Sequence, residues 1–263
     1  MKRILFVAAL VVNGTIALMA QSSIRINVGY ALPLGRQMIG EARNETSASS
    51  GSVKAVYASY GSGFPFQVGY SRNFKNSSLG FDIEAGYIFG KKQKFTSHYE
   101  DGSSATQRSY ARAFQIAPSL TFTEKVGKVA LYSRVGPVVS FTKMHFHITG
   151  FDGTWTTLIG YEANGGFDIG FKGALGVTIN PEEKVQFFSE LNFTALSCAP
   201  KEGKLDELNI GGANVLPDLS AEERKISFEE DYQYSDSDAS IVDTRSKYAM
   251  SSLAIQVGIR FVL

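Results

Sequence analysis

The side chains that could perform acid–base or metal chemistry in this sequence are few. The 263 residues include three histidines, His98, His145 and His147. An enzyme acting on lipids or peptides would need a histidine beside a nucleophile or an acid. His145 and His147 share one face of a strand, but two ligands are a weak basis for a metal site, since zinc takes four. We therefore interpret the histidines as exposed polar residues and predict no catalytic residue, no metal and no cofactor.

The acidic residues near the end of the chain form two short runs. Glu229-Glu230-Asp231 and Asp236-Ser237-Asp238 lie in a segment, residues 199–246, that has 12 acidic and 5 basic residues. Such runs could hold a divalent cation or a basic partner, and they are also typical of a solvated loop. We adopt the solvated loop. Cys198 is the only cysteine, which excludes an internal disulfide.

A third group of charged residues alternates with apolar residues along the chain. Four members are acidic and four are basic, so they can neutralise one another. Buried charges are tolerated mainly when they are paired. The alternation therefore predicts an internal charge network, comprising Arg25, Asp82, Glu84, Arg134, Asp168, Lys172, Glu190 and Arg260.

The elements that carry these charges are predicted strands with a strict period of two. The last strand is typical: large apolar residues alternate with small or polar ones up to the last residue. Eight such runs occur, at residues 24–32, 64–74, 81–90, 110–122, 129–142, 167–179, 185–194 and 252–263. Residues 53–60 could form a further strand, which leaves eight strands or ten open.

The connections between these runs alternate strictly between long and short. Short connections have about four residues, and long ones have about 15 to 48. Short periplasmic turns at one rim and long extracellular loops at the other are typical of outer-membrane barrels. The sequence thus predicts an all-β fold, a single antiparallel up-and-down transmembrane β-barrel of eight strands, with a long fourth extracellular loop at residues 199–246.

Periodicity alone does not say which face of each strand lies inside. A soluble lipocalin-like barrel would place the large apolar side chains inward, around a ligand. Here the opposite face consists largely of Gly, Ala, Ser and Thr, which suits the narrow lumen of an eight-stranded barrel. Arg134, Lys172 and Glu190 are predicted near mid-height on this small and polar face. If this face contacted lipid, each basic residue at that height would cost about 2–4 kcal/mol. We therefore expect the apolar face to contact lipid and the lumen to be plugged.

The N-terminal residues are predicted to direct export of the chain. Lys2 and Arg3 precede the apolar run 4–12, and Ala20 ends a segment typical of a signal peptide, so we predict cleavage after residue 20 and a barrel domain at residues 21–263. A net charge of +1 gives no indication of nucleic-acid binding.

These features together resemble the small outer-membrane β-barrel family that includes OmpA, OmpX and OmpW. The resemblance covers residues 24–263 and rests on pattern, without a specific motif. It implies a Gram-negative cell envelope and contact with outer-membrane lipid and lipopolysaccharide. It also implies that the assembly machinery reads the C-terminal strand. Family members usually end in an aromatic residue, whereas this chain ends in Leu263, two residues after Phe261.

Three functions are compatible with this architecture. The first is a structural or interaction protein that anchors extracellular loops, with residues 199–246 available to an extracellular protein partner. The second is a small porin-like channel or a conduit for small or hydrophobic solutes. The third is a lipid-modifying enzyme. We favour the first, because a crowded and self-neutralising lumen argues against an open pore and no catalytic constellation is recognisable.

Overall fold

The computed structural model describes residues 19–47, 50–231 and 241–263. The predicted signal peptide, residues 1–20, therefore lies outside the described residues except for its last two positions. The acidic run Asp236-Ser237-Asp238 also lies outside them. In the part of the chain that is described, no helix is long and apolar enough to cross a membrane.

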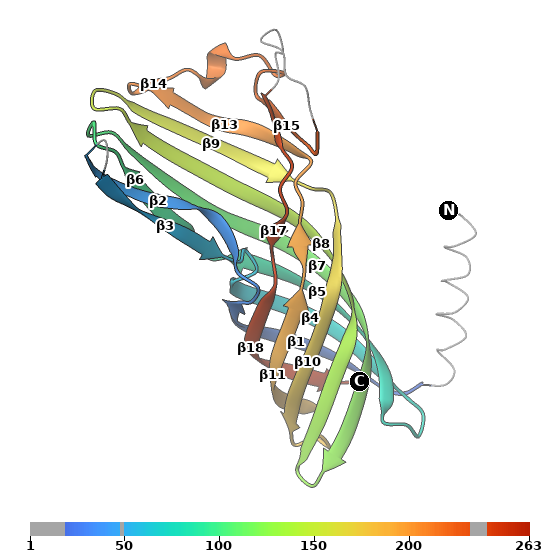
Figure 1. The fold of residues 1–263 in the computed structure, drawn as a ribbon. Helices are drawn as coiled ribbons and strands as arrows, with labels where there is room; N and C mark the ends of the chain where they lie inside the picture. The colour runs from blue at the N-terminus through green and yellow to red at the C-terminus, as the bar shows by residue number, and fades with distance from the viewer. Residues whose placement is uncertain (1–18, 48–49, 232–240) are drawn as a thin grey trace.

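Eight antiparallel strands pair into a closed ring (Figure 1). Each pairs with two neighbours, and the last strand pairs with the first, so the ring has no free edge. The prediction of an all-β antiparallel barrel is confirmed. In order around the ring the strands are β1 (Met19–Pro33), β4 (Gly63–Phe74), β5 (Leu79–Gly90), β7 (Ser104–Val126), β8 (Val129–Phe151), β10 (Asp168–Ile179), β11 (Val185–Ala195) and β18 (Ser252–Val262).

All three short connections lie at one end of the barrel, near the C-terminus (Figure 1). We call this the short-turn end. Asn76, Gly127 and Asn180 adopt positive φ angles there, a conformation that glycine and asparagine tolerate best in tight turns. The four long connections lie at the opposite end, which agrees with the sorting predicted from the sequence.

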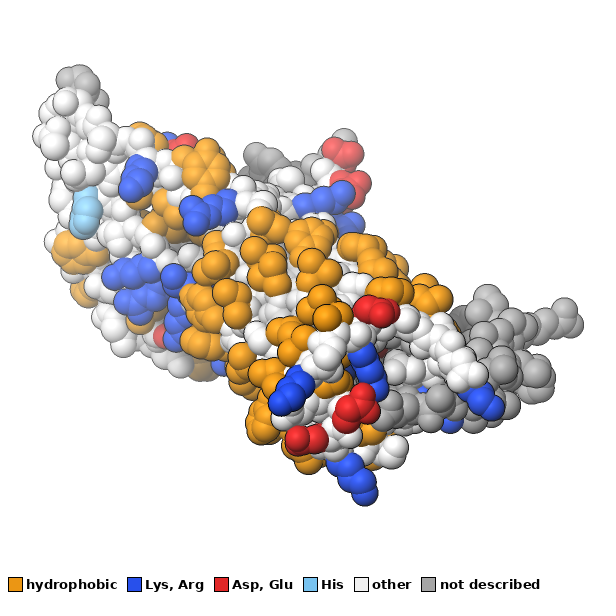
Figure 2. All heavy atoms as spheres, turned by 90° about the horizontal axis from the view of Figure 1, so that it is seen from below, with side chains coloured by type: hydrophobic (Ala, Val, Ile, Leu, Met, Phe, Trp, Pro, Cys, Tyr) orange, Lys and Arg blue, Asp and Glu red, His pale blue; other side chains and the backbone are white. Residues whose placement is uncertain are grey.

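The barrel wall is apolar outside and polar inside. Large apolar side chains project outward along every ring strand and form a belt, of which Figure 2 shows the side that faces the viewer. The alternate positions are buried in the lumen and include Asn27, Gln67, Gln115 and Gln256. A soluble protein would bury the first set, whereas a membrane-spanning barrel exposes it to lipid. The structure therefore agrees with the orientation predicted from the small and polar residues.

Above the barrel, β7 and β8 continue far beyond the belt, and each is 23 residues long. Their upper halves carry an open sheet, which we call the platform (Figure 1). Besides the ends of β7 and β8, the platform contains β2 (Gln37–Ser47), β3 (Ser50–Ala58), β6 (Gln93–His98), β9 (Thr156–Asn164), β13 (Glu202–Ile210), β14 (Ala213–Asn214), β15 (Lys225–Glu229) and β16 (Ile241–Thr244).

Several segments predicted as loops therefore form strands. Residues 199–246 contain β13 to β16 and a short 3-10 helix, Leu216–Asp218, instead of a plain loop. Residues 53–60 overlap β3, which belongs to the platform and not to the ring. The predicted count of eight thus describes the ring alone. Among the platform strands, β2 and β3 have little alternation, because they are stabilised by strand pairing more than by burial of one face, whereas β15 alternates over its five residues.

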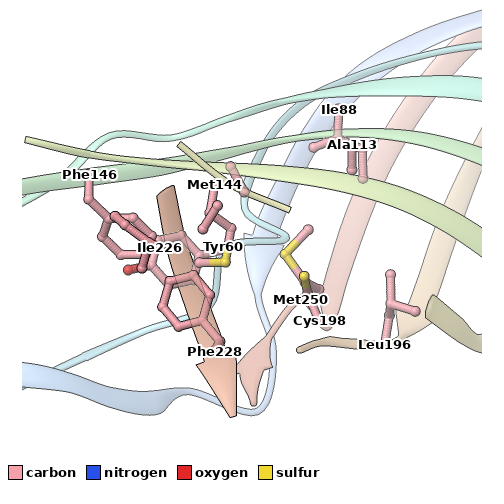
Figure 3. Packing of buried hydrophobic residues seen from close by; sticks show 12 residues of the cluster. Tyr60, Ile88, Ala113, Met144, Phe146, Leu196, Cys198, Ile226, Phe228 and Met250 are labelled. Atoms are coloured by element: carbon pink, nitrogen blue, oxygen red, sulfur yellow. The ribbon is translucent and has the colours of Figure 1, made fainter. Parts of the chain in front are cut away.

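An apolar cluster lies at the junction of barrel and platform (Figure 3). It draws Met144 and Phe146 from β8, Ile226 and Phe228 from β15, and Tyr60 from the connection that follows β3. Two short strands, β12 (Ser197–Cys198) and β17 (Tyr248–Ala249), pair beside it and extend the β11–β18 pair upward. Cys198 is fully buried in this cluster, as expected for a packing residue.

Gly69 gives a direct test of how tightly the lumen is packed. A Cβ atom at this position would lie 2.7 Å from Cζ of Arg25, whose side chain is completely buried and held by two carboxylates. We expect Gly69→Ala to lower the free energy of unfolding by about 1–3 kcal/mol through overpacking. Urea titration of the folded protein in lipid vesicles would measure this. Gly150→Ala is the control, because a Cβ there meets no atom within 4 Å. Equal unfolding midpoints for the two variants would contradict a tightly packed lumen.

Candidate functional site in the lumen and above it

The centre of the lumen is occupied by a charge cluster built around two carboxylates of β5. Asp82 and Glu84 are two residues apart, so the period of the strand turns both side chains inward. Arg25 on β1 approaches from one side. Its Nη2 atom lies 2.9 Å from Oδ1 of Asp82 and 2.6 Å from Oε2 of Glu84. Arg25 is 0% exposed, so both interactions are shielded from water.

Arg134 on β8 connects these carboxylates to the far wall. Its Nη1 atom lies 2.9 Å from Oε2 of Glu84 and 3.2 Å from Oδ1 of Asp82, and its Nη2 atom donates to both oxygens of Glu190 on β11 at 2.7 Å. Lys172 on β10 forms an ion pair with Glu84. The hydroxyl of Tyr132 donates to Glu190 at 2.7 Å.

The lumen cluster is electrically neutral. Its three cations and three carboxylates are all buried: Arg25, Arg134, Lys172, Asp82, Glu84 and Glu190. Opposite charges at hydrogen-bond distance offset the large cost of removing each charge from water. The cluster therefore bridges five strands of the ring and fills the mid-section of the lumen.

The two other charges predicted for the network lie elsewhere. Arg260 is directly opposite Arg25 in the β1–β18 register, but it stacks over the rings of Tyr132, at 5.0 Å, and Phe188, at 5.6 Å. Among the described residues it has no salt bridge. Asp168 lies near the upper end of the barrel wall, opposite Ser140. Parity placed both residues on the inner face but could not give their height relative to the cluster.

A layer of amides lies beside the charge cluster. Asn27 on β1 donates through Nδ2 to Oε1 of Gln67 on β4, at 2.7 Å, and to Oε1 of Gln256 on β18. All three side chains are buried. These amides and Tyr132 were not among the residues predicted for the network, although their positions in the alternating pattern place them on the inner face.

The lumen is also closed toward both ends. A cavity of about 60 Å³ lies at the short-turn end and is lined in part by Arg134, Arg260 and Tyr132, which leaves space for only a few water molecules. At the platform end, the side chains of the apolar cluster occupy the interior. There the Tyr60 hydroxyl bonds with Ser109 at 2.8 Å, and burial raises the pKa of Tyr60 to about 12. Among the described residues, side chains therefore occupy the lumen from the short-turn end to the apolar cluster.

The histidines lie on the platform strands and do not contact a common partner among the described residues. Nδ1 of His145 lies 3.2 Å from Glu162, and the ring of His145 stacks on Tyr110 at 4.7 Å. Burial lowers the pKa of His145, and the nearby Arg112 lowers it further. Nδ1 of His147 lies 3.6 Å from Glu207, whereas His98 is exposed.

The expectation that all three histidines are exposed is wrong for His145, which is 8% exposed because Tyr110 covers its ring. Within the described ranges, no three His, Cys, Asp or Glu side chains are gathered in a way that could hold a metal ion.

Comparisons with known proteins give little beyond this geometry. The sequence matches no protein-family profile, and no curated protein is significantly similar to it. Among solved structures, Neisserial surface protein A aligns with 91% of this chain and 96% of its own, at 11% identity and a TM-score of 0.38.

Ail, the attachment invasion locus protein of Yersinia pestis, aligns with 92% of this chain and 100% of its own. The TM-score is 0.32 at 12% identity for Ail alone, and 0.33 at 11% identity for its complex with the heparin analogue sucrose octasulfate. At such values these likenesses carry no argument, and the assignment of the barrel rests on its own strand pairing.

Proposed function

We propose that this chain is an outer-membrane protein of a Gram-negative cell, with a barrel that anchors and orients the platform for interaction outside the cell. The continuation of β7 and β8 carries this proposal. A tilted strand climbs about 2.5 Å per residue, so about ten residues cross a belt of about 25 Å. Each of these strands has 23 residues, and the excess builds a surface that a plain anchor would not need.

The closed lumen supports a role in interaction over a role in conduction. A conduit needs a continuous polar or apolar path, whereas this lumen is filled by the neutral charge cluster and then by the apolar cluster. The proposed role requires no catalytic chemistry. Its partner surface would include the strands formed by residues 199–246 and the free edge of β3, which pairs only with β2 among the described strands. The outward apolar face of β18 is the feature we propose the assembly machinery reads.

Labelling of single cysteines on intact cells tests the proposed orientation. Val53 on β3 is 60% exposed, and Lys128 lies in the turn between β7 and β8 at the short-turn end. A membrane-impermeant maleimide should label Val53→Cys and not Lys128→Cys. The native Cys198 is buried and should stay unlabelled in both. Labelling of Lys128→Cys alone would reverse the orientation and contradict the proposal.

Conductance in planar bilayers tests the closed lumen. The reconstituted protein should add no conductance above the bilayer leak, because the charge cluster and the apolar cluster occupy the lumen formed by the described residues. Folded protein is verified first by its heat-modifiable migration in gels. Steady single-channel steps from protein that passes this check would favour the porin-like alternative.

A further inference from the structure

The outward surface of the platform carries a strip of basic residues directly above the apolar belt. We call Lys92, Lys94, Arg108, Arg112 and Lys143 the cationic strip. They belong to β6, β7, β8 and the connection before β6, and all are exposed. In Figure 2, Lys and Arg side chains gather beyond one edge of the orange belt.

Strand register places like charges of the strip against one another. Arg112 lies directly opposite Lys143, and Lys94 lies directly opposite Arg108. Like charges facing each other across a strand pair are destabilising. Two such pairs in adjoining parts of one sheet therefore indicate that an anion binds there and neutralises them.

The neighbouring acids neutralise only a small part of this charge. Glu162 lies 3.6 Å from Lys143 and also faces His145, and Glu207 lies 3.6 Å from His147. Lys92 and Arg112 flank the ring of Tyr110, at 5.5 and 5.6 Å. Lys92, Lys94, Arg108 and Arg112 have no salt bridge to any described residue.

The height of the strip corresponds to the level of lipid headgroups. On the outward face of β7, Arg112 is the next residue above Phe114 in the direction of the platform. On β8, Lys143 is likewise the next outward residue above Phe141. The two phenylalanine rings lie 6.4 Å apart at the top of the belt. On β7, Phe122 marks the lower part of the belt, and ten residues separate it from Arg112. At about 2.5 Å per residue this distance is about 25 Å, the height of the apolar band.

A shallow hollow completes the arrangement. It has a volume of about 360 Å³, and Lys92, Arg108, Tyr110 and His147 contribute to its lining, together with one acidic residue, Glu207. Basic side chains around a hollow can surround a phosphate, and the planar guanidinium of arginine can donate two parallel hydrogen bonds to it.

We propose that the cationic strip binds the phosphate of a phosphorylated lipid in the outer leaflet, while its acyl chains pack on Phe89, Phe114 and Phe141. All three rings are exposed. Phe114 and Phe141 lie immediately below the strip, and Phe89 lies opposite Arg112. The inference rests on the proposed membrane orientation. It adds a binding site of defined chemistry, a phosphorylated headgroup, to a barrel that would otherwise contact lipid without selectivity.

Retention of lipid by the purified full chain tests this site. Protein in maltoside micelles is mixed with lipid A, a phosphorylated glucosamine lipid, and bound lipid is counted by native mass spectrometry. The double variant Arg112→Gln, Lys143→Gln should bind lipid A about ten-fold more weakly or worse, because two charge-assisted hydrogen bonds to the phosphate are lost. Lys128→Gln, Lys184→Gln removes the same charge at the short-turn end and should bind as the wild type does.

Two further arms identify the source of the phosphate. Dephosphorylated lipid A should bind the wild type as weakly as the double variant binds lipid A. Equal binding of both lipids to the wild type would show that only the apolar belt is recognised, and would overturn the proposal. Displacement of lipid A by millimolar inorganic phosphate would assign the strip to a free anion, which also overturns it.

Failure of this inference is distinguishable from failure of the proposed function. If the double variant retains lipid A fully but passes the cysteine-labelling test, only the lipid site is wrong. Heat-modifiable migration of the double variant verifies that its barrel is folded. The exposed positions of Arg112 and Lys143 make a loss of folding unexpected.

Discussion

Glu84→Gln should destabilise the barrel by about 3–5 kcal/mol, the cost of removing one partner from a buried ion pair. Glu84 accepts contacts from Arg25, Arg134 and Lys172 and is 2% exposed. With glutamine, three buried cations would share only the charges of Asp82 and Glu190. The net positive charge that remains in the lumen has no access to solvent. Urea titration of the protein in lipid vesicles measures the loss.

Glu182→Gln is the matched control for this substitution. Glu182 pairs with Lys125 at 2.8 Å, but both side chains are more than half exposed. Exposed pairs contribute about 0–1 kcal/mol, so this variant should unfold close to the wild type. If the two glutamine variants had the same midpoint, the lumen cluster would not be a stabilising element.

Phe146→Ala should loosen the platform while the barrel stays folded. Phe146 is 3% exposed, stacks on Tyr161 of β9 at 4.8 Å, and lies 6.0 Å from the ring of Tyr248. Truncation of a buried phenylalanine costs about 3–5 kcal/mol, because contacts are lost and a cavity remains. The loss falls on β9 and β15, which depend on the apolar cluster (Figure 3). We expect faster tryptic cleavage at Arg224 and Lys225, with unchanged heat-modifiable migration.

Phe151→Ala provides the comparison for Phe146→Ala. Phe151 ends the same strand and is 40% exposed, so its truncation leaves no cavity. Its cleavage rate should equal that of the wild type. Cleavage of Phe146→Ala at the wild-type rate would mean that the apolar cluster does not hold the platform. Loss of heat-modifiability would mean instead that the cluster stabilises the barrel as a whole.

The ring strands were predictable because each has one face in lipid and one in the lumen. This contrast imposes a period of two, which β18 shows along its whole length. The strict sorting of turn lengths then gave the up-and-down topology. The platform strands β2 and β3 have no such contrast. Apart from Ala58 at the end of β3, their residues are intermediate or exposed on both faces, so their sequences are similar to those of loops. The platform strand β15 does alternate, but over only five residues.

The charged residues that line the lumen could be predicted from the sequence, but the pairs that they form could not. Parity placed Arg25 and Arg134 on the inner face of their strands, but pairing depends on the relative height of strands that the sequence does not specify. Arg260 illustrates the limit. It lies in register with Arg25, yet it stacks over the rings of Tyr132 and Phe188 and donates a hydrogen bond to Thr178 at 3.4 Å. Aromatic stacking of this kind leaves no periodic signal in the sequence.

The seam between β1 and β18 has a consequence for the order of assembly. It joins side chains as distant in sequence as Asn27 and Gln256, which are 229 positions apart. Closing so long a loop costs about 3 kcal/mol more than closing a ten-residue hairpin, so the hairpins are expected to form first and the seam last.

The residues of the charge cluster would then give the two halves of the sheet opposite net charges. The strands before the turn at Gly127 contribute Arg25, Asp82 and Glu84, a net charge of −1, and those after it contribute Arg134, Lys172 and Glu190, a net charge of +1. In a membrane of low dielectric constant, this attraction would draw the halves of the unclosed sheet toward each other. The groups that fill the finished lumen would thereby also guide its closure.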